Sequence, residues 1–186
     1  MELNATQIAT LKSAIIADPN LATARTNHTG DGTQMITDYL NAAGALMVWR
    51  TSVSTSVLFD AITWANLTPN DAPDGTQAWL CRSLACQGKQ FNLQLIFASR
   101  DTIDPSKTNV RAGLQDALTN VPSGTGGTTV SAGWAGVRVA MQRPATHLEA
   151  IFANTAASPA SLVVEGAIDE LTIRKLAFAD NGDWLL

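Results

Sequence analysis

The chain has 186 residues, of which 46% are hydrophobic and only 15% are charged, and its formal net charge is −4. This length suits one domain, with or without an extended arm, and a core that needs neither disulfides nor metals. A mildly acidic chain lacks the basic surface on which sequence-independent nucleic-acid binding depends. Ordinary domains carry about a quarter charged residues, so a surface this poor in charge favours permanent contacts with other protein chains.

The sequence shows no sign of a membrane segment or a secretion signal. No stretch approaches the roughly 20 apolar residues that span a bilayer, and Met1–Asn4 lacks the basic start of a signal peptide. We therefore expect synthesis in the cytoplasm and no membrane partner. Cys81 and Cys86 share one expected helix and point away from each other there, so we expect no disulfide and no metal site.

Apolar spacing predicts two helices in the N-terminal third of the chain. The first begins at Ala5 and ends at Pro19, and after a polar loop over 20–33 the second covers about 33–43. The apolar run at 46–51 fits either an extended segment or the end of a helix.

Two further helix starts are expected before residue 73. Ser54 is a candidate cap, and Thr68–Asp71 has the pattern of a capped start with Pro69 at the first position. The expected inward-facing residues of the helix after Ser54 are Val57, Leu58, Ile62 and Trp64.

The stretch 73–121 carries the clearest helical pattern. The apolar positions of its first helix are Leu80, Leu84, Phe91 and Leu95. A second helix is expected to start with Asp104 as its N-cap and Pro105 in the first position. The apolar positions of this second helix are Val110, Leu114, Ala117, Leu118 and Val121. Two helices joined by a short polar link usually fold back on each other, so we expect an αα-hairpin.

The C-terminal third has a weaker pattern. The glycine-rich stretch 122–133 is expected to be an exposed loop. Pro144 interrupts a helical face between Trp134 and Phe152, and either kinks one helix or starts a new one. Residues 162–166 have strand character, and 168–178 fit either a strand or a short helix.

These patterns predict a mainly α fold, a helical bundle with an αα-hairpin, a small late β element and an extended C-terminal arm. The expected division is a helical body over 1–160, followed by the β element and docking arm over 161–186.

Catalytic motifs are missing from the sequence. The glycine-rich run Gly124–Thr129 lacks the lysine of a phosphate-binding loop. His147 and Glu149 could form a general-base pair, but no recognisable nucleophile motif accompanies them, so His147 is interpreted as a half-exposed helix residue. We expect no enzyme activity, catalytic residue, cofactor or metal.

Two features suggest contacts with other chains. Lys107 and Arg111 lie one helical turn apart and could pair with a neighbouring carboxylate. Together with Arg143 they are the candidate subunit-interface residues. The apolar end Trp184–Leu186 either docks into a partner or folds back onto the protein's own core.

Several short phrases of this sequence occur together in one order. They are Trp49–Val53, Ile62–Trp64, Asp104–Gly113, Arg143–Thr146, Glu149–Ala153, Ser158–Ala160 and Val164–Gly166. Their combination resembles a family of small proteins encoded by tailed bacteriophages and prophages, over about Leu11 to Ile168. The chain departs from the family pattern at His147, where a basic residue is expected, and at Asn154–Ala157, which lacks a glycine pair; the first departure weakens the case for a charged role of that helix.

The resemblance, with the size, helix content and low charge, implies a virion structural protein similar to head–tail adaptors. Such a protein forms a ring below the capsid portal. Its implied partners are copies of itself, the portal protein and the next neck or tail protein, with DNA passing through the lumen without specific binding. The implied portal-binding residues are Leu162, Val164, Ile168, Ile173, Phe178, Trp184, Leu185 and Leu186. Another neck, tail or capsid-associated protein, or a phage assembly factor outside the virion, is the alternative.

Overall fold

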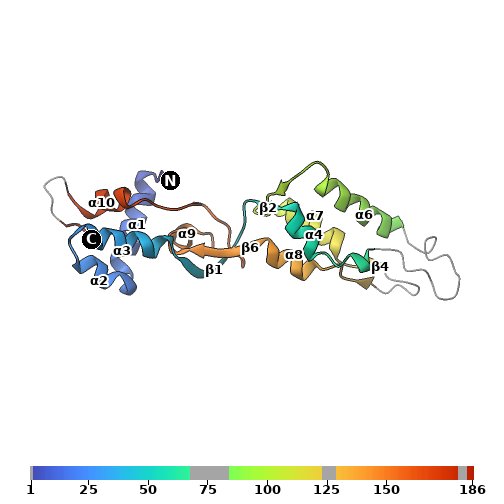
Figure 1. Cartoon of the computed structure of the whole chain (residues 1–186), viewed down its shortest axis with the longest axis horizontal. Helices are drawn as coiled ribbons and strands as arrows, with labels where there is room; N and C mark the ends of the chain where they lie inside the picture. Colours follow the sequence, from blue (N-terminus) through green and yellow to red (C-terminus); the bar gives the residue numbers. More distant parts are fainter. Residues whose placement is uncertain (1, 68–83, 123–128, 180–183) are drawn as a thin grey trace. The chain divides into compact units, whose positions relative to one another are not determined.

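A computed structural model describes residues 2–67, 84–122, 129–179 and 184–186. The chain is mainly α-helical, as predicted, and divides into two compact units (Figure 1). Unit 1 comprises Met1–Val48 and Pro144–Leu186, and unit 2 comprises Trp49–Arg143. The chain crosses from one unit to the other within strands β1 (Ala43–Trp49) and β6 (Gln142–Thr146), which pair with each other.

Unit 1 is built from both ends of the chain. Its helices are α1 (Ala5–Ala17), η1 (Pro19–Leu21), α2 (Ala22–Thr26), α3 (Gly30–Asn41), α9 (His147–Phe152) and α10 (Glu170–Ala177). The first helix begins with a capping box, in which the Asn4 side chain accepts the Gln7 N–H at 3.0 Å and the Gln7 side chain accepts the Asn4 N–H at 2.9 Å. The core of unit 1 joins α1, η1, α2, α3, α9 and α10 through Leu11, Ile15, Leu21, Ala24, Ile36, Leu40, Leu148, Ile168, Ile173 and Leu176.

The polar loop predicted over 20–33 is wrong for most of its length. Residues 19–26 form η1 and α2, and Leu21 and Ala24 are buried in the core. The turn-forming residues that follow act as a helix cap, because the Thr29 hydroxyl accepts the Asp31 N–H at 3.2 Å and starts α3. Burial of two apolar side chains therefore overrode the local turn signal.

The strand predicted over 162–166 is also wrong. These residues are irregular, and the nearby β contacts are two isolated bridges, one between Ser161 and Asn154 and one between Ala160 and Val48. The Gly166 N–H is bound by the carboxylate of Glu149 at 3.2 Å. At least this backbone donor therefore goes to a side chain and not to a ladder.

The segment 168–178 resolves as helix α10. Asp169 caps it by accepting the Thr172 N–H at 2.8 Å, and Ile173 is fully buried. The structure does not confirm an extended arm, since α10 packs on α3 and the side chains of Trp184 and Leu186 pack against the core of unit 1. The described residues on both sides of the expected 160/161 boundary lie in unit 1.

Unit 2 is one continuous stretch of chain. Its elements are β2 (Val53–Ser54), α4 (Thr55–Ala61), η2 (Trp64–Asn66), α6 (Leu84–Phe97), β3 (Thr102–Ile103), α7 (Thr108–Leu118), β4 (Val121–Pro122), β5 (Thr129–Val130) and α8 (Trp134–Ala140). Strand β2 pairs antiparallel with β3, and β4 pairs antiparallel with β5. The predicted apolar stripe of α7 is confirmed for Leu114, Ala117 and Leu118, which are fully buried; Val110 is partly buried, and Val121 is fully buried but lies in β4.

The predicted start of α7 is wrong. The helix begins at Thr108, and Asp104 instead closes a turn by accepting the Ser106 N–H at 2.9 Å. The Arg111 guanidinium donates to the carbonyls of Pro105 and Ser106, each at 2.6 Å. These bonds satisfy carbonyls before the helix and explain why the turn is retained there.

The predicted buried face of α6 is wrong in its described part. Phe91 and Leu95 are 57% and 53% exposed, whereas Leu93 and Phe97 are buried. Leu80 and the side chain of Leu84 lie outside the described residues, as do the expected helix start at Thr68–Asp71, the side chains of Cys81 and Cys86, and residues 123–128 of the expected loop. In and after α4, Leu58 and Ile62 are buried as predicted, but Val57 and Trp64 are 48% and 40% exposed.

Pro144 neither kinks a helix nor starts one. It lies within strand β6, between the end of α8 and the start of α9. A proline is tolerated in a two-stranded sheet because a strand with one partner needs only part of its N–H groups. The run 46–51, left open between a strand and a helix end, is for the most part strand β1.

Candidate functional site

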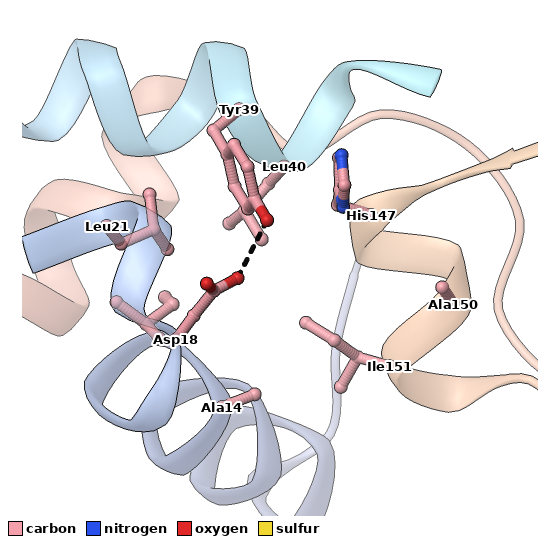
Figure 2. A pocket seen from close by; sticks show the side chains of 9 residues that line it. Ala14, Asp18, Leu21, Tyr39, Leu40, His147, Ala150 and Ile151 are labelled. Carbon is pink, nitrogen blue, oxygen red and sulfur yellow. Dashed lines mark hydrogen bonds between the residues drawn. The ribbon is translucent and has the colours of Figure 1, made fainter. Parts of the chain in front are cut away.

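A pocket in unit 1 gathers ionisable side chains against an apolar wall (Figure 2). It has a volume of about 300 Å³. The residues that line it are Ala14, Ile15, Asp18, Leu21, Tyr39, Leu40, His147, Ala150 and Ile151. They come from α1 and the residue after it, η1, α3 and α9, so the pocket exists only once both ends of the chain have folded together.

Asp18 and Tyr39 form the polar centre of the pocket. The Tyr39 hydroxyl donates to Asp18 Oδ2 at 2.8 Å, and Asp18 Oδ1 accepts the backbone and side-chain N–H groups of Asn20 at 2.9 and 3.0 Å. Burial alone would raise the Asp18 pKa, but the hydrogen bonds from Asn20 and Tyr39 outweigh it and hold that pKa below its usual value. Asp18 is therefore a carboxylate at neutral pH.

The phenol keeps its proton. Burial, and then the hydrogen bond to Asp18, raise the Tyr39 pKa above its usual value. The two shifts agree, because both place the shared proton on Tyr39 and the negative charge on Asp18. The pocket thus presents a fixed anion at neutral pH.

His147 completes the polar wall. Its ring stacks on the ring of Tyr39 with 4.2 Å between centroids and 18° between planes, and Figure 2 shows the two rings facing each other. The His147 backbone N–H donates to the Ala42 carbonyl at 3.0 Å, just after the end of α3. These contacts fix the imidazole beside the phenol. The predicted half-exposed helix position of His147 is confirmed.

Glu149, the other member of the pair considered for general-base chemistry, serves a structural role. Its carboxylate is buried and accepts the backbone N–H groups of Thr146 at 2.9 Å and Gly166 at 3.2 Å. The first of these bonds belongs to the capping box of α9. Glu149 does not line the pocket that contains His147.

The pocket has polar binding groups in Asp18, Tyr39 and His147. The described residues around it include no serine, threonine, cysteine or lysine. Its chemistry is therefore that of an anionic hydrogen-bonding centre beside aliphatic side chains. Among the described residues, no group of three His, Cys, Asp or Glu side chains is placed to hold a metal ion.

Unit 2 carries a second, apolar groove of about 380 Å³. Its lining residues are Phe59, Trp64, Leu67, Gln90, Leu93, Gln94 and Phe97. The ring of Phe59 stacks on Trp64 with centroids 5.0 Å apart and meets Phe97 at 4.7 Å. Because Phe59 and Trp64 are each 40% exposed, the groove presents aromatic surface to its surroundings.

The candidate interface residues Lys107, Arg111 and Arg143 differ in their surroundings. Arg111 is engaged within unit 2, where its guanidinium lies 4.6 Å from the ring centroid of Trp49 and also donates to Thr108 Oγ1 at 3.0 Å. Lys107 is exposed and pairs with Asp104 at 3.7 Å. Arg143 is half-buried in strand β6.

The candidate partner-binding residues of the C-terminal segment mostly lie in or against unit 1. Val164, Ile168 and Ile173 are buried, and Leu162 is partly buried against Val48 and its neighbours. The ring of Trp184 stacks on His28 at 5.0 Å, and Phe178 meets the same ring edge-on at 5.0 Å. Leu186 is partly buried, whereas Leu185 is 42% exposed.

Sequence reasoning missed Asp18 and Tyr39. Asp18 follows the last residue of α1 and precedes Pro19, a position typical of a cap, and nothing in its local pattern points to a pocket. Tyr39 is the only tyrosine of the chain, and this was the one sequence feature that could have drawn attention to it. Their partner His147 comes from the far end of the sequence.

No family model, curated protein or solved structure matches this chain. None of the described helices combines the length and the apolar character required to cross a lipid bilayer.

Proposed function

We propose that this chain is a structural protein of a tailed-phage particle, similar to a head–tail adaptor, which assembles with copies of itself into a ring below the portal. Two lines support the proposal: the resemblance of its sequence phrases to small tailed-phage proteins, and the apolar surface of unit 2. The apolar surface of unit 2 is the observation on which the proposal mainly depends.

Large apolar side chains are exposed on three helical segments of unit 2. Val57 and Phe59 on α4 are 48% and 40% exposed, and Trp64 in η2 is 40% exposed. On α6, Phe91 and Leu95 are exposed by more than half. Each Å² of apolar surface removed from water stabilises a complex by about 25 cal/mol, so exposed apolar side chains of this kind favour burial against another protein.

Few charged side chains would have to lose their water when this surface is buried. Only 15% of the residues are charged, and Lys89 on α6 is already paired with Asp116 at 3.3 Å. Burial of this face therefore carries little desolvation cost. In a closed ring each subunit presents one face to one neighbour and a different face to the other, and in this proposal α6 and α7, packed side by side, supply one of these faces as the αα-hairpin.

The C-terminal segment contributes the contact with the portal protein in this proposal. Since Ile168 and Ile173 are buried in unit 1, that contact falls to exposed side chains such as Leu185, while Trp184 holds the segment in place. The next neck or tail protein binds another face of the ring, and DNA passes through the lumen without specific binding. The proposed location is the virion neck.

Self-association is tested with the double substitution Phe91→Ser and Leu95→Ser, measured by light scattering after size-exclusion chromatography. The matched control is Val139→Ser, because Val139 is also apolar and 69% exposed but lies on α8 and not on α6. We expect the wild type and the control to form the same oligomer and the double variant to dissociate. A monomeric wild type, or equal assembly of all three, contradicts the proposal.

The place in the particle is tested by quantitative mass spectrometry of purified virions. An adaptor occurs at a fixed, low copy number and co-purifies with the portal. A fixed copy number without portal association favours another neck, tail or capsid-associated role. Detection only in the infected-cell lysate favours an assembly factor and ends the virion proposal.

A further inference from the structure

The pocket of unit 1 lies where two helices end. Asp18 directly follows α1, and Tyr39 lies in the last turn of α3. The C-terminal end of a helix carries partial negative charge, equivalent to about half an elementary charge, and attracts cations. Neither helix has a basic residue in its own last turn. These helix ends and the Asp18 carboxylate therefore put negative charge in the pocket, and His147, at the start of α9, is the one basic side chain in its described lining.

The Asp18 carboxylate retains hydrogen-bonding capacity. An ionised carboxylate offers about four acceptor positions, and three are used, by the two N–H groups of Asn20 and by the Tyr39 hydroxyl. Arg25 is a basic residue close to Asp18 in the sequence, and its guanidinium donates to the main-chain carbonyls of Ile16 and Asp18. It does not line the pocket.

The rest of the lining is aliphatic. In Figure 2 the side chains of Leu21, Leu40 and Ile151 surround the Asp18 carboxylate. At about 300 Å³ the pocket is at the small end of ligand pockets, which span roughly 300–1,000 Å³. A ligand that matches it has a short aliphatic stem and a compact cationic head.

We propose that this pocket binds an alkylammonium group, the chemistry of a lysine side chain or of a small free diamine. The ammonium donates to the remaining acceptor position of Asp18 and lies beside the Tyr39 oxygen, while its stem packs on Leu21 and Ile151. Only the charge on Asp18 is needed for this recognition. The inference concerns unit 1 and does not depend on the proposed place in a phage particle.

The chain supplies its own reporters for the test. Tyr39 is the only tyrosine, and His147 and His28 are the only histidines. The ring signals of Tyr39 and His147 in an NMR spectrum therefore report on the pocket, and the His28 signal, from a ring stacked on Trp184, serves as the reference outside it.

The full chain is titrated with Nα-acetyl-lysine methylamide and, separately, with the norleucine analogue, which has a similar stem but no ammonium. We expect the lysine compound to shift the Tyr39 and His147 signals, to leave His28 unmoved, and to bind about tenfold more tightly than the norleucine compound. Binding of the norleucine compound as tightly as the lysine compound overturns the proposal.

Asp18→Asn removes the charge and keeps a side-chain acceptor. We expect it to weaken binding of the lysine compound by about tenfold. Asp38→Asn is the matched control, because Asp38 is an exposed carboxylate on the same helix as Tyr39 but does not line the pocket. If Asp18→Asn fails to fold, the affinities of the lysine and norleucine compounds for the wild type still test whether the pocket recognises an ammonium group.

A third titration with 1,5-diaminopentane separates the two sources of the ammonium group. Tighter binding of the diamine identifies a free diamine, and tighter binding of the lysine compound identifies a side chain of a protein partner. Both results support an alkylammonium site. Binding of neither compound overturns the site, and it leaves the oligomer measurements on unit 2 unaffected.

Discussion

The hydrogen bond between Tyr39 and Asp18 has a stabilising effect whose size follows from its geometry. A 2.8 Å bond from a neutral hydroxyl to an ionised carboxylate contributes about 1.5–3 kcal/mol when it is buried. Asp18 is only partly buried, so solvent screening reduces the expected contribution to about 1 kcal/mol. The perturbations are Tyr39→Phe, Asp18→Ala and the double variant, which together form a thermodynamic cycle.

The assay is urea unfolding of the wild type and the three variants. At neutral pH the coupling free energy between Tyr39 and Asp18 should be about 1 kcal/mol. Because the folded-state pKa of Asp18 is depressed, its contribution is present above the unfolded-state pKa of about 4 and is lost as the pH falls through the lower folded-state pKa. The coupling should therefore disappear in strong acid.

A spectroscopic titration gives an independent check. Since Tyr39 is the only tyrosine, the ultraviolet absorbance of phenolate reports its ionisation directly. Asp18→Asn should lower the Tyr39 pKa, because the negative neighbour that opposes phenolate formation is gone, whereas Asp38→Asn should leave it nearly unchanged. Zero coupling at neutral pH, coupling that persists in acid, or an unmoved Tyr39 pKa would refute the reasoning.

Three further predictions concern stability and are checked by chemical denaturation. Leu114→Ala should destabilise unit 2 by about 3 kcal/mol because the side chain is fully buried, whereas Leu95→Ala, at a half-exposed position, should cost less than about 1 kcal/mol. Gly133→Ala should destabilise by about 2 kcal/mol, because φ is +90° and the new methyl group would meet backbone atoms at 2.6 and 2.8 Å; Gly88→Ala, in an open helical position, should stabilise by about 0.5–1 kcal/mol. Trp184→Ala should destabilise unit 1 by about 2 kcal/mol through loss of its ring contacts, and an unchanged midpoint would mean that the C-terminal residues do not pack as described.

Helices with a buried face on one side were predictable from the sequence. The stripe through Leu114 and Leu118 places the core side of α7 correctly, because a period of 3.6 fixes which residues share a face. The same reasoning chose the wrong face of α6, since Phe91 and Leu95 are as apolar as Leu93 and Phe97. Hydrophobicity cannot distinguish a core face from an exposed apolar face, and tertiary packing made the choice.

The pocket could not be predicted, because nothing local joins its members. Asp18 looks like a cap, Tyr39 like a helix residue near a core, and His147 like the first residue of a short helix. Each description is correct for the element concerned. Their convergence depends on α1, α3 and α9 packing together, a long-range arrangement that spacing rules do not contain.

The division of the chain has a consequence for its synthesis on the ribosome. Unit 2 is one uninterrupted stretch, and its two ends meet where the Arg50 N–H donates to the Met141 carbonyl at 2.9 Å. Unit 1 needs Pro144–Leu186, which follows unit 2 in the sequence. Unit 2 can therefore finish folding before Pro144–Leu186 has been made, so the helices within Met1–Val48 wait longer for their partners than those of unit 2 do.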